Sequence, residues 1–140
     1  MSKRKPLVRD LMSEAVITLR ATDRVSQALR EMTLGSVRHI PVVDVHGRLV
    51  GLVSSHDLVA AVERAGDPPL DSLMTKDLVT VGPDTPAATA VGDMIDHKRN
   101  CLPVVGKDGE LLGILTATDF LVVAQQALSG APIERLAHEL

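Results

Sequence analysis

The segment RHIPVVDVHGRLVGLVSSHD, residues 38–57, returns 62 residues later as NCLPVVGKDGELLGILTATD, residues 100–119. Both copies keep a Pro-Val-Val run, two glycines four residues apart and a final aspartate. The correspondence extends without a gap back to Leu11, which matches Leu73. Because matches at glycine and proline are the hardest to obtain by chance, the pattern indicates an internal repeat. The sequence therefore predicts two copies of one small supersecondary unit.

Each copy shows the same succession of local patterns. A short apolar run, residues 16–19 or 78–81, has the composition of a buried strand. Apolar residues at helical spacing follow, and then come two strand-like runs joined by a glycine-containing turn. After Asp57 and Asp119 the spacing is helical again. The order β-α-β-β-α, occurring twice, predicts a fold of the mixed α/β (α+β) class.

The repeat also divides the chain into segments. We expect two repeats of nearly equal length, separated by a short linker that prolines stiffen. The basic residues at the N-terminus fit a solvated tail better than a nucleic-acid arm, because no aromatic residue is interleaved for base stacking. Apolar residues at helical spacing near the C-terminus fit a short helix that either caps the module or binds a partner. The expected bounds are 1–7 for the basic tail, 8–64 for the first repeat, 65–69 for the linker, 70–126 for the second repeat and 127–140 for the C-terminal tail or short helix.

Composition excludes several classes of protein. The 140 residues carry a net charge of −3, so no overall field attracts nucleic acid. No apolar run approaches the ~20 residues that span a bilayer, and no signal-peptide pattern opens the chain; we therefore expect a cytoplasmic protein without membrane insertion. The single cysteine, Cys101, cannot form a disulfide framework and is interpreted as a buried small hydrophobe. The histidines do not fall at recognised ligand spacings, so no metal is expected.

A polar motif ends each copy: Gly, two apolar residues, Ser or Thr, two further residues and Asp. It places Ser54 and Asp57, and likewise Thr116 and Asp119, where a strand ends and a helix begins. A helix N-terminus offers free N–H groups and partial positive charge, which suits phosphate. A carboxylate there can accept hydrogen bonds from both hydroxyls of a ribose, each worth about 1.5–3 kcal/mol. Plain capping of the helix is the alternative.

Basic residues distinguish the two copies. Arg38 and His39 precede the first Pro-Val-Val run, and the aligned residues of the second copy are Asn100 and Cys101, with Arg99 just before them. Arginine reads phosphate well because it donates two parallel hydrogen bonds. The copies are therefore expected to differ in their affinity for phosphate, unless these residues are ordinary surface charges.

In order, spacing and duplication these motifs resemble the CBS domain, the family named after cystathionine β-synthase. The resemblance covers about residues 8–124, nearly the whole chain. The stretches that carry it are Leu11-Met12-Ser13, residues 38–44 and residues 51–57 in the first copy, and Leu73-Met74-Thr75, residues 102–105 and residues 113–119 in the second.

The resemblance implies that two CBS repeats pack through their sheets with pseudo-two-fold symmetry and form two clefts. Clefts of this family bind adenosine derivatives, so the expected ligand is AMP, ADP or ATP, with S-adenosylmethionine or NAD as further members of the class. Asp57 and Asp119 would bind ribose, and strand residues would border the adenine. The residues assigned to ligand binding are Thr18, Arg38, His39, Ile40, Pro41, Ser54, Asp57, Thr80, Arg99, Leu102, Pro103, Thr116 and Asp119.

The expected function is that of a regulatory module that senses an adenosine derivative and signals to a partner protein. We find no nucleophile–base pair, metal cluster or Walker-type loop in the sequence, so an enzyme is not expected. A structural or oligomerisation scaffold with empty clefts is the alternative. Long apolar helix faces beside a small core predict a homodimer built on the helices of both repeats.

Overall fold

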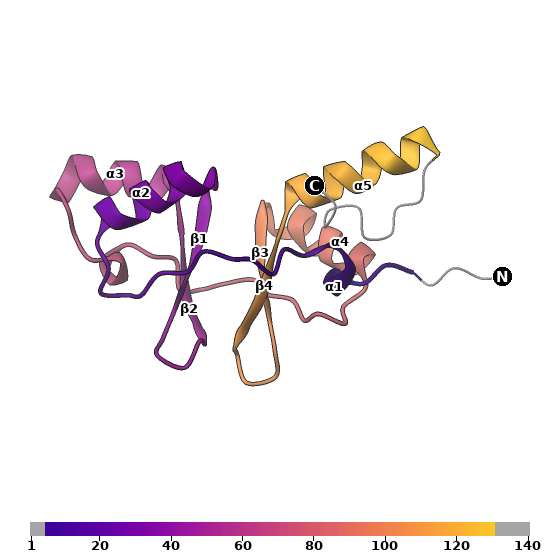
Figure 1. Cartoon of the computed structure of the whole chain (residues 1–140), viewed down its shortest axis with the longest axis horizontal. Coiled ribbons are helices and arrows are strands. Elements are labelled where there is room, and N and C mark those ends of the chain that lie inside the picture. The colour runs from indigo at the N-terminus through magenta and orange to yellow at the C-terminus, as the bar shows by residue number, and fades with distance from the viewer. Residues whose placement is uncertain (1–4, 131–140) are drawn as a thin grey trace. The chain divides into compact units, whose positions relative to one another are not determined.

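The computed structural model describes residues 5–130 (Figure 1). The helix expected after residue 132 lies outside the described residues. The elements in chain order are α1 (Val8–Leu11), α2 (Val25–Gly35), β1 (His39–Val43), β2 (Leu49–Ser54), α3 (Ser55–Ala65), the short 3-10 helix η1 (Leu70–Ser72), α4 (Ala87–His97), β3 (Cys101–Val105), β4 (Leu111–Thr116) and α5 (Ala117–Ser129).

These elements form two compact units, each made from segments distant in the sequence. The first-repeat unit comprises Val16–Leu78 and the turn Asp108–Leu111. The second-repeat unit comprises Val79–Lys107, the described residues up to Ala15, and those from Leu112 onward. The segment with which each sequence repeat begins therefore belongs to the unit of the other repeat. We call these segments, residues 6–13 and 68–75, the lead-in segments.

In the first-repeat unit, β1 and β2 pair antiparallel, with an irregularity between Val42 and Val43. Leu19 joins the outer edge of β1 in parallel, where its N–H donates to the carbonyl of Pro41 at 3.1 Å. The strand predicted over residues 16–19 is thus reduced to one pairing residue. The chain turns immediately afterwards, since the N–H of Arg20 donates to the carboxylate of Asp23 at 2.8 Å.

The core of this unit lies between the paired strands and the helices α2 and α3, which contact each other. Both helices are amphipathic, and the apolar stripe of each is buried while its other face meets solvent. Burying one such aliphatic side chain contributes about 1.5–3 kcal/mol. The buried cluster comprises Val25, Ala28, Met32, Ile40, Val42, Val53, Leu58, Ala61, Leu70 and Met74.

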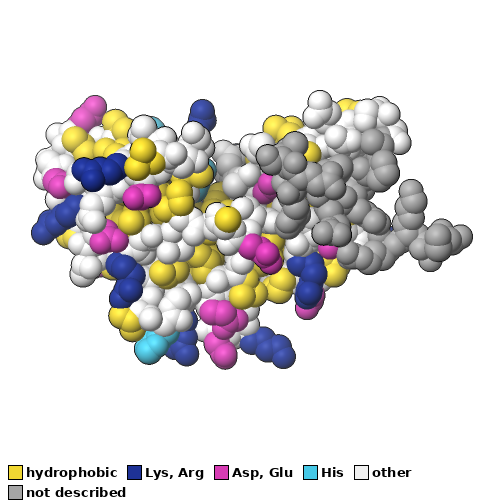
Figure 2. Space-filling view, viewed as in Figure 1, with side chains coloured by type: hydrophobic (Ala, Val, Ile, Leu, Met, Phe, Trp, Pro, Cys, Tyr) yellow, Lys and Arg dark blue, Asp and Glu magenta, His cyan; other side chains and the backbone are white. Residues whose placement is uncertain are grey.

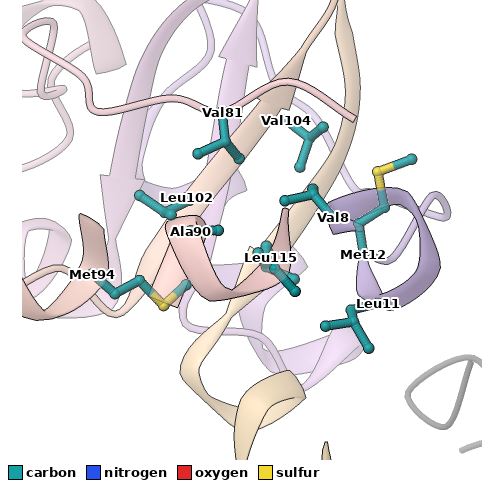
Figure 3. Close-up of a cluster of buried hydrophobic side chains, with 10 residues drawn as sticks. Val8, Leu11, Met12, Val81, Ala90, Met94, Leu102, Val104 and Leu115 are labelled. Atoms are coloured by element: carbon teal, nitrogen blue, oxygen red, sulfur yellow. The ribbon is translucent and has the colours of Figure 1, made fainter. Parts of the chain in front are cut away.

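The second-repeat unit repeats this plan. β3 pairs with β4, and Val81 joins β3 in parallel beside Val104, again as one pairing residue of the strand predicted over residues 78–81. Figure 3 shows Val8, Leu11 and Met12 of the N-terminal lead-in segment among the core side chains of this unit. The prediction of a mixed fold built twice from the same elements is confirmed.

The two lead-in segments are held by equivalent backbone hydrogen bonds. The N–H of Val8 donates to the backbone carbonyl of Thr85 at 2.8 Å. Leu70, which corresponds to Val8 in the second repeat, donates its N–H to the backbone carbonyl of Asp23, also at 2.8 Å. Each segment then pairs antiparallel with the free edge of a strand, through Ser13 with β4 and through Thr75 with β2. Each lead-in segment thus completes a sheet as well as a core.

A glycine on each strand makes this pairing possible. A Cβ at Gly113 would stand 2.8 Å from the carbonyl oxygen of Ser13, and one at Gly51 would stand 2.5 Å from the sulfur of Met74. Both distances are shorter than van der Waals contact allows. The recurrence of glycine at these positions therefore reflects the close approach of a lead-in segment.

We predict that Gly113→Ala destabilises the protein by about 1–3 kcal/mol, because its methyl group would displace backbone of the lead-in segment. Gly92→Ala in α4 is the matched control: apart from its chain neighbours and the backbone of α4, no heavy atom of the described residues lies within 4 Å of its added Cβ. This control should stabilise the protein by up to about 1 kcal/mol, because alanine favours helix. Urea unfolding followed by circular dichroism measures both changes. Equal stabilities for the two variants would contradict the close approach.

Candidate functional site

The first candidate site lies where β2 ends and α3 begins. Ser54 is the N-cap of α3, and its hydroxyl oxygen accepts a hydrogen bond from the N–H of Asp57 at 3.3 Å. Ser54 also pairs with His39 across the β1–β2 ladder. The N–H of Ser55 donates to the carbonyl of Arg38 at 2.9 Å. The fold thereby brings together four residues that the sequence assigned to ligand binding.

The carboxylate of Asp57 is half-buried at this site. Within residues 5–130 this carboxylate accepts no hydrogen bond. The capping contact involves the backbone N–H of Asp57 and the hydroxyl of Ser54, and leaves the carboxylate oxygens unused. His39 is its charged neighbour. Burial lowers the pKa of His39; the negative charge of Asp57 acts against this shift, and the positive charge of Arg38 adds to it. The imidazole is therefore held toward its neutral form while Asp57 offers two acceptor oxygens.

The second candidate site has the same backbone but uses its aspartate differently. The N–H of Ala117 donates to the carbonyl of Asn100 at 2.9 Å, as Ser55 does to Arg38. Here the carboxylate of Asp119 accepts from the N–H of Thr116 at 2.8 Å and from its hydroxyl at 3.4 Å. Asp119, the third residue of α5, therefore forms a capping box with the N-cap residue Thr116. Capping of this kind is compatible with ligand binding.

The two sites also differ beside the aspartate, because Cys101 occupies the place of His39. Its side chain is 5% exposed, which confirms that it is a buried small hydrophobe. Burial, together with the nearby charge of Asp119, raises the pKa of Cys101 to about 12. The thiol is uncharged at any physiological pH, so the second site lacks the titratable group of the first.

Other residues assigned to ligand binding lie in the cores. Ile40 and Leu102 are fully buried, each in its own hydrophobic cluster, and Pro41 and Pro103 are buried in the same two strands. The resemblance implied a wall for the adenine ring, whereas these side chains pack against the protein interior. Thr18 and Thr80 are exposed, each directly before the residue that pairs with β1 or β3.

Arg99 lies beside the second candidate site, because it lines the same cavity as Asn100 and Ala117. This apolar cavity of about 410 Å³ lies between the end of α4 and the start of α5. Sequence reasoning missed this cavity, since helical spacing shows which residues face inward but not how closely two helices pack at their ends. The lining residues are Val91, Met94, Ile95, Lys98, Arg99, Asn100, Ala117, Phe120 and Leu121.

A search of the described residues for metal ligands finds no group of three or more His, Cys, Asp or Glu side chains that could hold an ion. No helix within residues 5–130 is both long and apolar enough to cross a membrane.

Comparison with known proteins establishes the family. The CBS domain model matches residues 8–64 and 70–125, and the chain therefore belongs to the CBS domain family. It is 37% identical over 112 residues to homoserine O-acetyltransferase of Methanococcoides burtonii; the match covers 80% of this chain but 23% of that protein. The chain thus spans about a quarter of the length of the first curated relatives it matches.

Two similar solved structures contain adenosine derivatives. The CBS domain pair of protein MJ0100, in complex with 5′-methylthioadenosine and S-adenosyl-L-methionine, has a TM-score of 0.80 at 26% identity and covers 91% of this chain and 98% of that one. CBSX2 in complex with AMP has a TM-score of 0.78 at 29% identity and covers 87% and 98% of the two chains.

We predict that Cys101 resists thiol reagents in the folded protein, because the reactive thiolate is scarce below its raised pKa and the sulfur is shielded. Iodoacetamide at pH 8 should modify native protein at least tenfold more slowly than protein unfolded in urea. Mass spectrometry of the alkylated chain measures both rates. Equal rates would show that the start of β3 opens readily and would contradict the burial of this position.

Proposed function

We propose that this protein is a regulatory module that binds adenine nucleotides and passes the state of occupancy to a partner protein. The observation that carries the proposal is the carboxylate of Asp57 at the start of α3, beside Arg38 and His39, which accepts no hydrogen bond from any described residue. Its support from comparison is the binding of AMP by CBSX2 and of 5′-methylthioadenosine and S-adenosyl-L-methionine by MJ0100. AMP, ADP and ATP are the proposed ligands, and S-adenosylmethionine and NAD share the same adenosine group.

In the first-repeat site, Asp57 binds the ribose by accepting a hydrogen bond from each hydroxyl. Bonds to a charged acceptor contribute about 1.5–3 kcal/mol each, so this residue dominates recognition of the sugar. The first turn of α3 and the guanidinium of Arg38 attract the phosphate. The exposed residue Thr18 borders the adenine, and the buried residues Ile40 and Pro41 anchor β1 in the core.

In the second-repeat site, the carboxylate of Asp119 both caps α5 and is needed for the ribose. It accepts from Thr116, and the same oxygens are needed for a ribose. A ligand must share or replace this capping contact, which costs part of the binding free energy. The exposed residue Thr80 and the buried pair Leu102 and Pro103 correspond to those of the first site. Arg99 and Lys98, which line the adjoining cavity, supply positive charge. We therefore propose weaker binding at the second site.

The proposed role is binding rather than catalysis, and no reaction or metal is assigned to the chain. Signalling follows if occupied and empty forms differ in their affinity for the partner. A scaffold whose sites stay empty is the competing function. The first copy of the motif favours binding, since capping a helix does not need the carboxylate of Asp57 to stay without a hydrogen bond, as it does among residues 5–130.

We predict that millimolar AMP raises the melting temperature by several degrees, because a ligand at a hundredfold excess over its dissociation constant adds about 2.7 kcal/mol to the stability. Circular dichroism suits the measurement, since the chain has no Trp or Tyr. Asp57→Asn should remove most of the shift and Asp57→Asn with Asp119→Asn all of it. Asp96→Asn, an exposed change on α4, should keep it. Ligand-free protein whose melting is unmoved by AMP, ATP and S-adenosylmethionine would establish the scaffold.

We also propose a homodimer that uses the helical faces. Large apolar side chains are exposed on the helices of both units, and Figure 2 shows hydrophobic side chains at the surface around α2 and α3. Apolar side chains that cluster on a helix surface support an interaction site there. The exposed residues are Leu34, Val59 and Val62 on α2 and α3, and Ile95, Leu121 and Leu128 on α4 and α5.

We predict that Leu121→Asp, at a side chain 68% exposed on α5, converts the dimer to a monomer of about 15 kDa, because association would bury an unpaired charge. Val45→Asp in the β1–β2 turn is the control; its side chain is 72% exposed but lies away from the helices, so the dimer should persist. Light scattering during gel filtration measures the mass. A wild-type monomer at tens of micromolar would refute the dimer.

A further inference from the structure

Resting on the proposed function, we infer that the first-repeat site takes up a proton when it binds the phosphate of an adenine nucleotide, and that the imidazole of His39 holds this proton. The second-repeat site, which has Cys101 at the same position, binds without this uptake. The affinities of the two sites of one chain for the same nucleotide would thus depend differently on pH.

The geometry places His39 at the phosphate end of the site. His39 opens β1 and faces Ser54, the residue that caps α3, across the strand pair. The start of α3 is where partial positive charge attracts phosphate. Asp57, in the first turn of the helix, is close enough to influence the charge of the imidazole. A phosphate drawn to the first turn of α3 therefore arrives beside His39.

Among the described residues, two charged groups act on His39. Asp57 comes from α3 and favours the imidazolium, Arg38 comes from the neighbouring position in the chain and disfavours it, and Ser54 of β2 is uncharged. Burial disfavours the charged form further and is the largest of these effects. The empty site therefore holds His39 neutral near pH 7, with room for its pKa to rise.

A bound phosphate reverses this balance. It brings a charge of about −1.5 to −2 next to the ring, and a neighbouring negative charge favours the imidazolium. Binding and protonation are linked, so the affinity for a phosphate-bearing ligand increases as the pH falls through the pKa of the bound form and levels off below that of the empty form. Each unit by which the pKa rises on binding corresponds to a tenfold gain in affinity across that window.

The second-repeat site serves as the control within the chain. Its thiol is neutral throughout this pH range, because the pKa of Cys101 is about 12. A phosphate there cannot recruit a proton from this position. Any proton taken up by the second site belongs to the phosphate itself, which titrates near pH 6 in either site.

The test is calorimetry of AMP binding at pH 7.0 in buffers of different ionisation enthalpy, which counts the protons taken up. Asp119→Asn is used as the background, so that the first-repeat site is measured alone. We expect several tenths of a proton more in this protein than in the same protein with His39→Gln, and an affinity that falls about threefold to tenfold more steeply between pH 6 and pH 8. Adenosine should show no such difference between the two proteins.

Nuclear magnetic resonance of the otherwise unaltered protein gives an independent measurement, which does not depend on how the variants fold. The His39 ring signal should titrate about one pH unit higher with AMP than without it. Equal proton uptake with and without His39, in protein that binds AMP, would overturn this inference and leave the proposed function standing. Failure of AMP to bind at any pH would overturn the proposed function itself.

Discussion

The pairing of each lead-in segment with a strand edge is the constraint on which the rest of the structure depends. A hairpin of two strands is marginal in water, and each hairpin of this protein becomes a stable sheet only with partners on both edges. On one edge, Leu19 pairs with β1 and Val81 pairs with β3. On the other edge, the lead-in segments pair through Thr75 with β2 and through Ser13 with β4. Neither sequence repeat contains all the parts of its own compact unit.

This constraint also positions the candidate sites. Leu52 is hydrogen-bonded in both directions to Thr75, and two residues later Ser54 ends the strand and caps α3. The direction in which α3 leaves the sheet is therefore fixed by a strand with neighbours on each side. A ligand at the start of α3 meets a preorganised N-terminus, which lowers the entropy lost on binding. The same holds for β4 and α5, where Ile114 and Ser13 bond in both directions.

Sequence reasoning predicted the parts of the fold that local chemistry determines. The hairpins, the helices after Asp57 and Asp119 and the burial of Cys101 follow from spacing and composition, and the structure has them. The lead-in exchange could not be predicted, because alignment of the repeats shows which residues correspond but not which unit each segment joins. The glycines at 51 and 113 are the sequence feature that indicates the close approach of the lead-in segments, because strand propensity alone does not explain them.

The candidate sites were predicted in part for a similar reason. The motif brings Ser54 and Asp57 together, as expected, because residues three apart meet at a helix N-terminus. The different use of Asp57 and Asp119 could not be read from the sequence, since both motifs satisfy the same capping rule and the choice depends on side-chain conformation. The burial of Ile40 and Leu102 was also hidden, because an apolar residue beside a proline fits a ligand wall and a core equally well.

The most direct measurement of the central claim is a crystal structure of the protein grown with AMP. We expect adenosine at the start of α3, with both ribose hydroxyls donating to the carboxylate of Asp57 and the phosphate between Arg38, His39 and the first turn of the helix. We also expect lower occupancy at the start of α5, where Asp119 caps its own helix. AMP bound away from both helix starts, or a fully occupied second site beside an empty first one, would contradict the proposed binding at Asp57.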